Sequence, residues 1–401
     1  MASEWRPITL GDVMSFANGK TSPERSDGLR HPVYGSNGVI GFANDTNSPE
    51  NTIVIGRVGS YCGSLYLSKQ KCWVTDNAIR ASALDDNDGR FLFYLLSTLD
   101  LNHWRAGSGQ PLLNQTILSQ IPASAPPADE QRAIAHILGT LDDKIELNRR
   151  MNETLEAMAR AIFKSWFVDF DPVRAKAEDR DPGLPKPIAD LFPARFDNSQ
   201  LGEIPTGWRV GTVDEEFNLT MGQSPPGETY NEAWEGLPFY QGRADFGFRF
   251  PSQRVFCTDP TRFAEAGDTL VSVRAPVGDI NMAAERCCIG RGVAATRHKS
   301  GSRSYTYHFM HSIEEVFDSF EAEGTIFGSI SKRDFHNIQR IVPPIQIVNA
   351  FDRFVAPIDD KIANNDQESR TLATLRDTLL PKLLSGEIKV KDAEKLLEKT
   401  L

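Results

Sequence analysis

The chain has 401 residues, of which 40% are hydrophobic and 24% charged, and its formal net charge is −10 at pH 7. The length allows two or three domains with sizeable cores, and the composition is that of an ordinary soluble protein. The acidic balance argues weakly against a nucleic-acid binder, although acidic residues on remote faces can outweigh a local basic cleft.

Signals for export, membrane insertion and disulfide formation are missing from the sequence. No apolar run has membrane-spanning length, and the first residues lack the apolar core of a signal peptide, so we expect a cytoplasmic protein with no membrane partner. The five cysteines are odd in number and show no CxxC spacing, which argues against a disulfide framework and a zinc site.

Residues 1–125 are predicted to form a mixed α/β domain. Short apolar runs such as Thr52–Ile55 and Ser64–Leu67 are separated by Gly, Asn and Ser, as expected for short strands joined by polar loops. One helix is predicted near Arg90–Leu96.

Residues 126–170 carry the spacing of a coiled-coil helix. After Pro126-Pro127, seam residues alternate four and three apart: Ile134, Leu138, Leu141, Ile145, Asn148, Asn152, Leu155, Ala159, Ile162 and Trp166. This spacing keeps one seam of the helix against a partner helix.

Residues 343–386 repeat this helix. Pro344 lies 217 residues after Pro127, and the corresponding seam is Phe351, Val355, Ile358, Ile362, Asn365, Ser369, Leu372 and Leu379. Both seams turn polar at the same place, which fixes register and partner choice in a coiled coil. We therefore expect the two copies to pack on each other, antiparallel; the alternative is two unrelated amphipathic helices on separate cores.

Each helix also contains a sequence that predicts a kink or a restart. Gly139-Thr140 in the first copy corresponds to Ala356-Pro357 in the second, and proline fits the first helical turn but not a helix interior. The aspartate pairs that follow, Asp142-Asp143 and Asp359-Asp360, are then interpreted as a solvated first turn. They are not interpreted as metal ligands, because the pattern has no histidine or third carboxylate.

The second half of the chain restarts the first. Trp208-Arg209 echoes Trp5-Arg6, Pro238–Tyr240 with Gly247-Phe248 echoes Pro32–Tyr34 with Gly41-Phe42, and Arg274 echoes Arg57. The difference in residue number between matching residues grows along the chain, which places the largest insertion of the second copy between Phe248 and Leu270. A shared frame with different loops is suited to one kind of task performed on two targets.

The predicted fold class is α+β, with two mixed α/β domains, each followed by a long helix. The two helices are expected to pack as an antiparallel coiled coil with a pseudo-twofold internal repeat. The predicted segments are the first domain at 1–125, the first helix at 126–170, a linker at 171–206, the second domain at 207–342, the second helix at 343–386 and a C-terminal tail at 387–401.

The sequence predicts no catalytic residues. Asn18–Thr21 resembles the end of a phosphate-binding loop, but that motif needs glycine where Met14 stands. None of the proline pairs is followed by the aromatic residue of a DNA amino-methyltransferase motif, and the histidines show no metal spacing beyond His308 and His311. We therefore expect no catalytic set, no metal and no cofactor bound by this chain.

Matched polar loops of the two domains are candidates for reading DNA. Arginine reads guanine and Asn or Gln reads adenine, while Ser, Thr and Lys often hold phosphates. The candidate DNA-binding residues are Lys20, Tyr34, Ser36, Asn37, Arg57, Ser60, Tyr61, Ser108, Gln110, Asn114, Gln223, Tyr240, Gln241, Arg243, Arg274, Thr325, Ser329 and Lys332.

Taken together with Glu130-Gln131, Leu141–Asn148, Phe167–Pro172 and Leu383–Ile388, the repeat resembles the specificity subunit of type I restriction-modification systems over essentially the full length. The second copy departs from the first in having Ile347-Val348 where Glu130-Gln131 stand.

The resemblance implies two target recognition domains that read the halves of a split, double-stranded DNA target. The helices would be the spacer, with Ile134, Leu138, Leu141, Ile145, Asn148, Leu155, Ile162, Ile358, Ile362, Asn365, Leu372 and Leu379 in the helix–helix contact. It also implies docking of two modification subunits, which carry S-adenosylmethionine and methylate adenine, and of restriction (motor-nuclease) subunits where the system has them.

Two other interpretations stay open at this point. A standalone DNA-modifying enzyme needs a catalytic motif that the sequence does not show. A tandem binding scaffold on a coiled coil, unrelated to DNA, predicts no modification-subunit gene beside this one.

Overall fold

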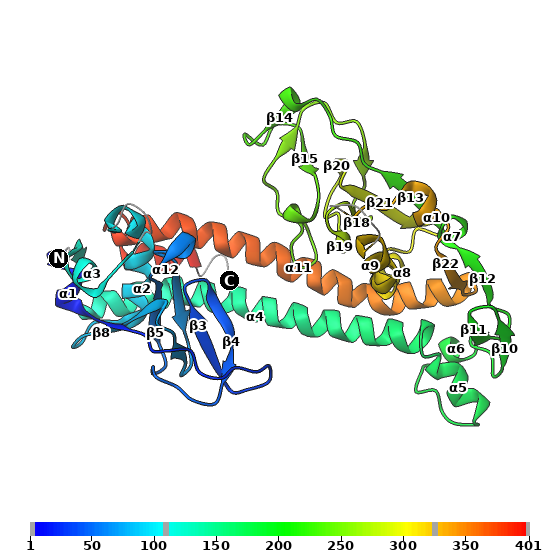
Figure 1. The fold of residues 1–401 in the computed structure, drawn as a ribbon, viewed down its shortest axis with the longest axis horizontal. Helices are drawn as coiled ribbons and strands as arrows, with labels where there is room; N and C mark the ends of the chain where they lie inside the picture. Colours follow the sequence, from blue (N-terminus) through cyan, green and yellow to red (C-terminus); the bar gives the residue numbers. More distant parts are fainter. Residues whose placement is uncertain (1–4, 107–111, 323–327, 398–401) are drawn as a thin grey trace. The chain divides into compact units, whose positions relative to one another are not determined.

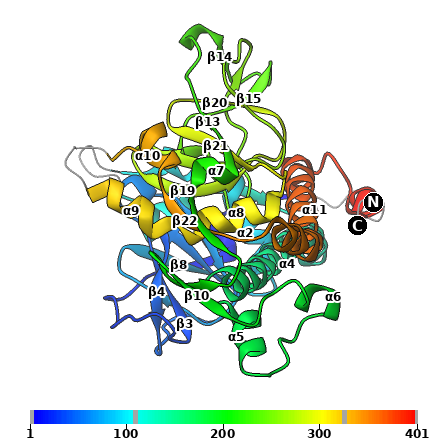
Figure 2. The same ribbon diagram turned by 90° about the vertical axis from the view of Figure 1, so that its right-hand side faces the viewer.

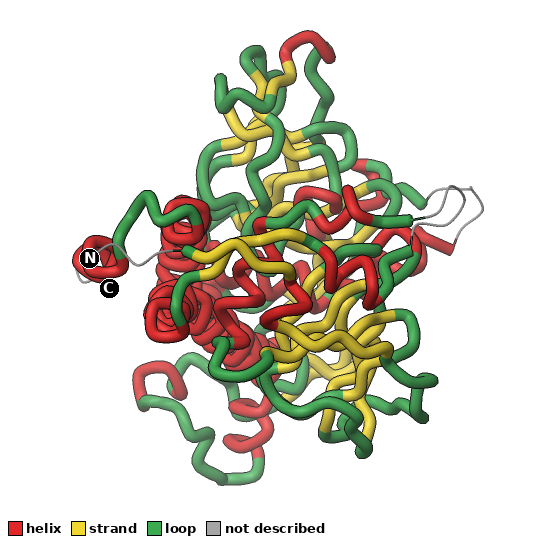
Figure 3. Tube along the Cα trace, turned by 90° about the vertical axis from the view of Figure 1, so that its left-hand side faces the viewer, coloured by secondary structure: helices red, strands yellow, loops and turns green. Residues whose placement is uncertain are grey.

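The computed structural model describes residues 5–106, 112–322 and 328–397. The chain divides into two compact units, Met1–Arg149 with Asp366–Leu401, and Arg150–Asn365. Each unit is α+β and contains a stretch of both long helices (Figure 1; helices red and strands yellow in Figure 3). The compact units therefore divide each predicted helical segment between them.

The first unit begins with short strands and small helices, as the sequence predicts. Its elements are β1 (Arg6–Thr9), α1 (Leu10–Val13), β2 (Met14–Asn18), β3 (His31–Gly35), β4 (Gly38–Ala43), β5 (Thr52–Gly56), η1 (Gly59–Tyr61), β6 (Leu65–Ser68), β7 (Trp73–Val74), β8 (Ala78–Ala83), α2 (Gly89–Thr98), η2 (Leu101–Trp104), α3 (Gln115–Gln120), β9 (Pro122–Ala125) and α12 (Val390–Leu397). The predicted helix near Arg90–Leu96 is confirmed as α2, whose N-terminus is capped by the Asp88 carboxylate.

The second unit repeats this order with additions. Its elements are α5 (Asp171–Ala177), α6 (Lys186–Ala189), β10 (Phe196–Ser199), β11 (Gly202–Pro205), β12 (Arg209–Thr212), α7 (Val213–Glu216), β13 (Phe217–Met221), η3 (Gly227–Thr229), β14 (Tyr230–Asn231), β15 (Leu237–Tyr240), η4 (Arg243–Asp245), β16 (Phe256–Cys257), β17 (Phe263–Ala264), β18 (Thr269–Val273), β19 (Val277–Met282), β20 (Cys287–Ile289), β21 (Val293–His298), α8 (Arg303–Ser312), α9 (Glu314–Ala322), α10 (Lys332–His336) and β22 (Gln339–Val342). Both β16 and β17 lie in the predicted insertion.

The predicted repeat of the two domains is confirmed by their sheet topology. The main sheet has the order β2-β8-β5-β6 in the first unit and β13-β21-β18-β19 in the second. In each unit a second sheet contains one parallel pair, β3 with β7 and β15 with β20. The entering and leaving strands also pair in each, β1 with β9 and β12 with β22.

The long helices α4 (Ala128–Phe167) and α11 (Ile345–Leu384) are each continuous, so the predicted restart is wrong, whereas the predicted kink stays a prediction. Thr140 donates its hydroxyl hydrogen bond to the His136 carbonyl inside α4, and does not cap a new helix. The Arg90 side chain packs closely against Gly139, because a Cβ there would lie 2.5 Å from the Arg90 guanidinium carbon. Pro357 sits within α11, where buried Val355 and Ile362 hold the helix on its neighbours.

The predicted seam residues lie inward in both units, and the helix segments run in opposite directions within each. In the first unit Asp142 pairs with Arg376 at 2.7 Å, and Asn148 Nδ2 donates to Glu368 Oε2 at 2.7 Å. In the second, Asn365 Nδ2 donates to Asn152 Oδ1 at 2.8 Å. The predicted polar layer of the seam is therefore satisfied by hydrogen bonds between the helices.

The predicted linker is an ordered part of the second unit. Figure 2 shows α5, α6 and β10 at the C-terminal end of α4, and Phe170, Val173 and Phe192 are buried in the core of this unit. The predicted C-terminal tail likewise contains α12, whose Ala393 and Leu397 are buried in the core of the first unit. In the described residues, every helix is too short or too polar to cross a membrane.

Candidate nucleic-acid interface

In the first unit, four loops meet at one edge of the sheets. They follow β2, β3 and β5 and precede β8. Lys20 N donates to Val74 O at 3.0 Å, Thr75 N donates to Tyr34 O at 2.9 Å, and Arg57 N donates to Asn77 O at 3.0 Å. These backbone bonds join the loops into one surface, held at the carboxyl ends of β2, β3 and β5.

Glycine allows two of these loops to approach each other closely. A Cβ at Gly19 would lie 2.0 Å from the Thr75 carbonyl oxygen, and one at Gly56 would lie 2.1 Å from the Tyr61 carbonyl oxygen. No side chain fits at either distance, so glycine is required for this edge to close.

Most of the described candidates of the first unit lie on this edge. Lys20, Asn37, Ser60 and Tyr61 are exposed, with Tyr61 52% exposed. Arg57 is half-buried, and its Nη1 donates to the Asp76 carbonyl at 3.4 Å. Ser36 is also half-buried and donates to the Asn77 carbonyl.

Two candidates of the first unit are structural instead. Tyr34 is 9% exposed and packs beside Tyr66, and burial raises the pKa of its hydroxyl. The Asn114 side chain accepts from Ile117 N at 2.9 Å and caps α3. Neither side chain is free to read a base.

The same edge exists in the second unit. Gln223 N donates to Ile289 O at 3.0 Å, Gly290 N donates to Tyr240 O at 2.8 Å, and Val273 N donates to Gly292 O at 2.9 Å. A Cβ at Gly292 would lie 2.2 Å from the Gln241 carbonyl oxygen, so the loops again approach at glycine.

The second edge carries several exposed basic and amide side chains. Gln223, Gln241, Arg243, Arg274, Ser329 and Lys332 are exposed, and Arg274 forms an isolated β-bridge with Ser329. Arg243 is 63% exposed and lies 3.4 Å from Asp279. Tyr240 is the exception: it is 2% exposed and belongs to the core, so the prediction that it contacts DNA is corrected.

The structure adds side chains that the sequence analysis missed. Exposed Arg291 lies between Gly290 and Gly292 on the second edge, and Asp76 and Asn77 occupy the corresponding loop of the first. The pair of glycines around Arg291 is the only sequence signal for it. Candidates Ser108, Gln110 and Thr325 lie outside the described residues.

This arrangement answers the objection raised by the net charge. Exposed Arg243, Arg274 and Arg291 lie in the loops of the second edge, with Asp279 3.4 Å from Arg243. A local basic edge can neutralise phosphates although the chain as a whole is acidic.

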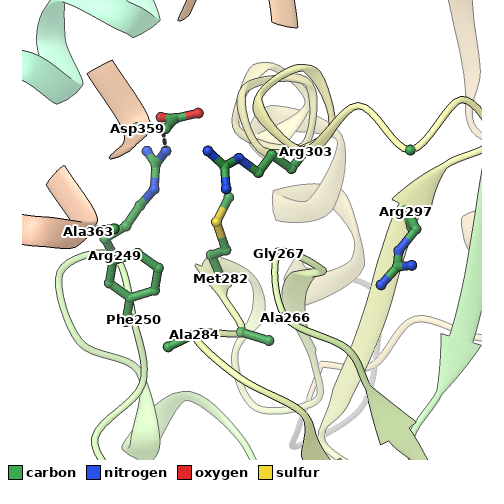
Figure 4. Close-up of a pocket in the computed structure, with 12 residues that line it drawn as sticks. Arg249, Phe250, Ala266, Gly267, Met282, Ala284, Arg297, Arg303, Asp359 and Ala363 are labelled. Carbon is green, nitrogen blue, oxygen red and sulfur yellow. Dashed lines mark hydrogen bonds and ion pairs between the residues drawn. The ribbon is translucent and has the colours of Figure 1, made fainter. Parts of the chain in front are cut away.

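A buried arginine ties the second edge to the helices. The loop that starts at Gln241 ends at Arg249, which is 2% exposed and pairs with Glu156 of α4. Figure 4 shows its second ion pair, with Asp359 of α11. Its guanidinium carbon lies 3.8 Å from the centre of the Tyr307 ring. Burial disfavours its charge, but Tyr307, Asp359 and Glu156 outweigh that effect and raise the pKa of Arg249.

The first unit fixes its α2 helix to α4 through the matching aspartates. Arg90 pairs with Asp143 at 2.8 Å and donates to the Gly139 carbonyl at 2.9 Å, and the Tyr94 hydroxyl donates to Asp142. The hydrogen bond from Arg90 is the largest factor that lowers the pKa of Asp143, to about 2. The aspartate pairs therefore help to attach the domains to the helices, and their interpretation as a first turn is wrong because α4 and α11 are continuous. Their predicted solvation holds for Asp143 and Asp360, which are 53% and 61% exposed, and not for Asp359, which is buried.

The described residues contain no group of three or more His, Cys, Asp or Glu side chains placed to hold a metal ion. All five cysteines are free and buried.

Comparison with known proteins adds a family to this geometry. The family model described as a type I restriction modification DNA specificity domain matches residues 2–157. A putative type I restriction enzyme specificity subunit of Methanocaldococcus jannaschii, MjaX, is 31% identical over 97% of this chain and 94% of its own length. The HindI specificity subunit of Haemophilus influenzae is 26% identical over 74% of this chain and 77% of its own.

A solved structure supports the fold. The S subunit of a type I restriction-modification system from M. genitalium superposes with a TM-score of 0.65, at 17% identity, over 95% of this chain and 96% of that one. This likeness concerns the fold alone.

Proposed function

Because the chain belongs to the family of type I restriction enzyme specificity subunits, we propose that its two units read the two halves of one split DNA target. Membership makes the chain the DNA-specificity component and not a catalytic one. We further propose that the target has two half-sites, that the long helices are the spacer between them, and that modification subunits dock on this chain.

The observation that carries the proposal is the repeat of one edge with different side chains. Both edges are built at the same strand ends and closed by glycine, yet one presents Lys20 and Asn37 and the other Gln223 and Arg243. Arginine reads guanine and Gln or Asn reads adenine in the major groove, so the two edges are suited to different base sequences. Lysine and serine side chains would hold the phosphates.

The long helices are proposed to set the gap between the half-sites. In this arrangement α4 and α11 form one antiparallel coiled coil with a pseudo-twofold axis, and the hydrogen-bonded polar layer of Asn148, Asn152 and Asn365 fixes its register. A helix from Ala128 to Phe167 has a length of roughly 60 Å at ~1.5 Å per residue. The unread gap would then follow from helix length and not from base contacts.

Two modification subunits are the proposed protein partners, and restriction subunits join where the system has them. The modification subunits would carry S-adenosylmethionine and methylate adenine, because the family to which this chain belongs is that of the specificity subunits. Much of the DNA affinity would come from them, which fits the acidic balance of this chain. Strong, salt-sensitive DNA binding by the isolated chain would contradict this division of labour.

The spacer is tested by removing one heptad from each helix. Deleting Glu146–Asn152 together with Ile362–Glu368 removes the polar layer from both helices and keeps the phase of both seams, so the apolar layers on either side would hold the register of the shortened spacer. Seven residues correspond to roughly 10 Å of helix, or about 3 base pairs of DNA. The gap in the methylated motif should shorten by about that much with both half-sites unchanged.

The control is a heptad deleted from α4 alone, which destroys the matched layers and should abolish methylation. An unchanged gap in the double deletion would refute the spacer. Methylation of DNA by the isolated chain with magnesium and S-adenosylmethionine would instead support a standalone enzyme.

A further inference from the structure

An open groove in the first unit is occupied in part by the chain itself in the second, where a pocket of about 290 Å³ remains beside Arg249, Phe250 and Met282. The groove has a volume of about 460 Å³ and is walled by β6, by the start of β4, by α2 and by Asp142, and Asn37 of the proposed DNA-reading edge also lines it. Apolar side chains dominate it, among them Val39, Leu65, Leu67 and Phe93. All of its lining residues belong to the first unit.

The corresponding place in the second unit is defined by the repeat. Sheet order places β19 where β6 stands, chain order places α8 where α2 stands, and the shift of 217 places Asp359 where Asp142 stands. There the segment Gly247–Phe250 lies on β19. The Arg249 carbonyl accepts from Met282 N at 2.9 Å, and the Gly247 carbonyl accepts from Asn281 Nδ2 at 2.9 Å.

Figure 4 shows the pocket that remains beside this segment. Arg249 and Phe250 lie beside Met282, and the Arg249 guanidinium reaches Asp359. Of the β19 residues at this place, Asn281 is fully buried and Met282 is 4% exposed. In β6, by contrast, Leu65 and Leu67 are only half-buried, and Val39 beside them is 48% exposed.

The difference arises from the path of the chain after the parallel pair. In the first unit the chain turns back as β4 and pairs with β3, with Tyr34 opposite Val39 and Gly35 opposite Gly38. In the second unit it leaves β15 at Tyr240 and runs to Arg249. The first unit therefore keeps an edge strand, β6, beside an apolar groove that its own chain does not enter in the described residues.

We propose that this groove of the first unit, between β6, α2 and Asp142, receives an extended apolar segment of a partner protein. The segment would add to the edge of β6 through its backbone and place apolar side chains on Val39, Leu67 and Phe93. Its position copies that of Gly247–Phe250 in the second unit.

The charges around the groove specify an apolar occupant. In the second unit Asp359 takes an arginine from the filling segment, whereas Asp142 already takes Arg376 from α11 at 2.7 Å. Lys69 and Arg90 at the rim share the Asp143 carboxylate. The occupant therefore needs no arginine, and the paired cations and apolar walls do not suit a DNA phosphate.

This inference rests on the function proposed above, which makes a modification subunit the partner. Because Gly247–Phe250 already lies on β19 in the second unit, only the modification subunit docked at the first unit would add a segment to this sheet edge. The two modification subunits of one complex would then be held by different contacts.

The test is isothermal titration calorimetry, in which the full chain is titrated with the modification subunit of its system. Val39→Arg places a charge and added bulk in the groove, and Val168→Arg is the matched control, because Val168 of the second unit is also 48% exposed. Thermal unfolding should be unchanged in both variants, since neither side chain is in a core.

The expected result is that Val39→Arg weakens one of the two binding events by about tenfold or more, while Val168→Arg leaves both unchanged. If Val39→Arg binds the modification subunit as tightly as the unaltered chain does, the proposal that the groove receives a partner segment is overturned, and the proposed function is unaffected. Equal weakening by both variants also overturns it, as does a loss of DNA affinity by isolated Val39→Arg. Failure of the unaltered chain to bind any modification subunit contradicts the proposed function itself.

Discussion

Replacing Arg249 by methionine tests whether the second DNA-reading edge depends on its attachment to the helices. The arginine is 2% exposed, and the side chains of Glu156 and Asp359 are 10% and 5% exposed. Methionine keeps most of the volume but leaves both carboxylates buried without their cation. Removing one partner of a buried ion pair costs about 3–5 kcal/mol. We expect the second unit to lose about that much stability.

The loss is large enough to measure directly. For a unit of this size each kcal/mol lowers Tm by about 2–4 °C, so unfolding of the second unit should move down by roughly 6–20 °C. Hydrogen exchange followed by mass spectrometry would assign the loss to the second unit. Below its new Tm, the complex should relax its sequence preference at the second half-site and keep the first.

Two further variants make the reasoning refutable. Arg376→Met removes a pair in which the arginine is 30% and Asp142 24% exposed, and it should cost ~1 kcal/mol or less. Adding Glu156→Gln and Asp359→Asn to Arg249→Met removes the unpaired charges and should restore most of the lost stability. A loss below about 1 kcal/mol for Arg249→Met would show that the arginine does not hold the loop.

The remaining predictions concern DNA reading, pH and thiol access. Arg243→Ala should lower the discrimination between bases at the second half-site by about 1–3 kcal/mol, and Arg57→Ala should lower it at the first half-site by the same amount. Methylation of mismatched targets measures both effects. The pKa of Asp143 falls from 3.8 to about 2 in the folded chain, so its contribution to stability is full above about pH 4 and is lost as the pH falls through about 2. Urea unfolding should therefore give Asp143→Asn the same free energy of unfolding as the unaltered chain near pH 2 and a lower one at pH 7. The difference at pH 7 should be less than ~1 kcal/mol because this carboxylate is half exposed. Burial raises the pKa of Cys287 to about 12, so maleimide should label it at pH 7 only at the rate of unfolding.

The sequence alone was enough to predict the repeated frame. The spacing from Ile134 to Trp166 and its copy identify the long helices, and the polar seam residues Asn148 and Asn365 lie in the contact as predicted. The matched Tyr34 and Tyr240 lie in the equivalent strands β3 and β15, and the matched Arg57 and Arg274 directly follow the equivalent strands β5 and β18. Such periodic signals are local, so they can be read without knowledge of the fold.

What the sequence could not predict depends on contacts between distant residues. Gly139 was interpreted as a helix breaker because nothing near it in sequence shows that Arg90 packs against it. Arg249 lies 93 positions from Glu156 and 110 from Asp359, and no motif marks it. Tyr34 and Tyr240 share the residue types of a DNA contact, and only the fold shows that they face a core.

The central claim is tested most directly by modification-sensitive sequencing of host DNA with and without this gene, while the neighbouring modification gene is expressed. The account predicts that methyladenine disappears from one split motif, two short half-sites around a fixed gap, when the gene is removed. A motif that is contiguous, or a methylation pattern that does not change, would contradict it.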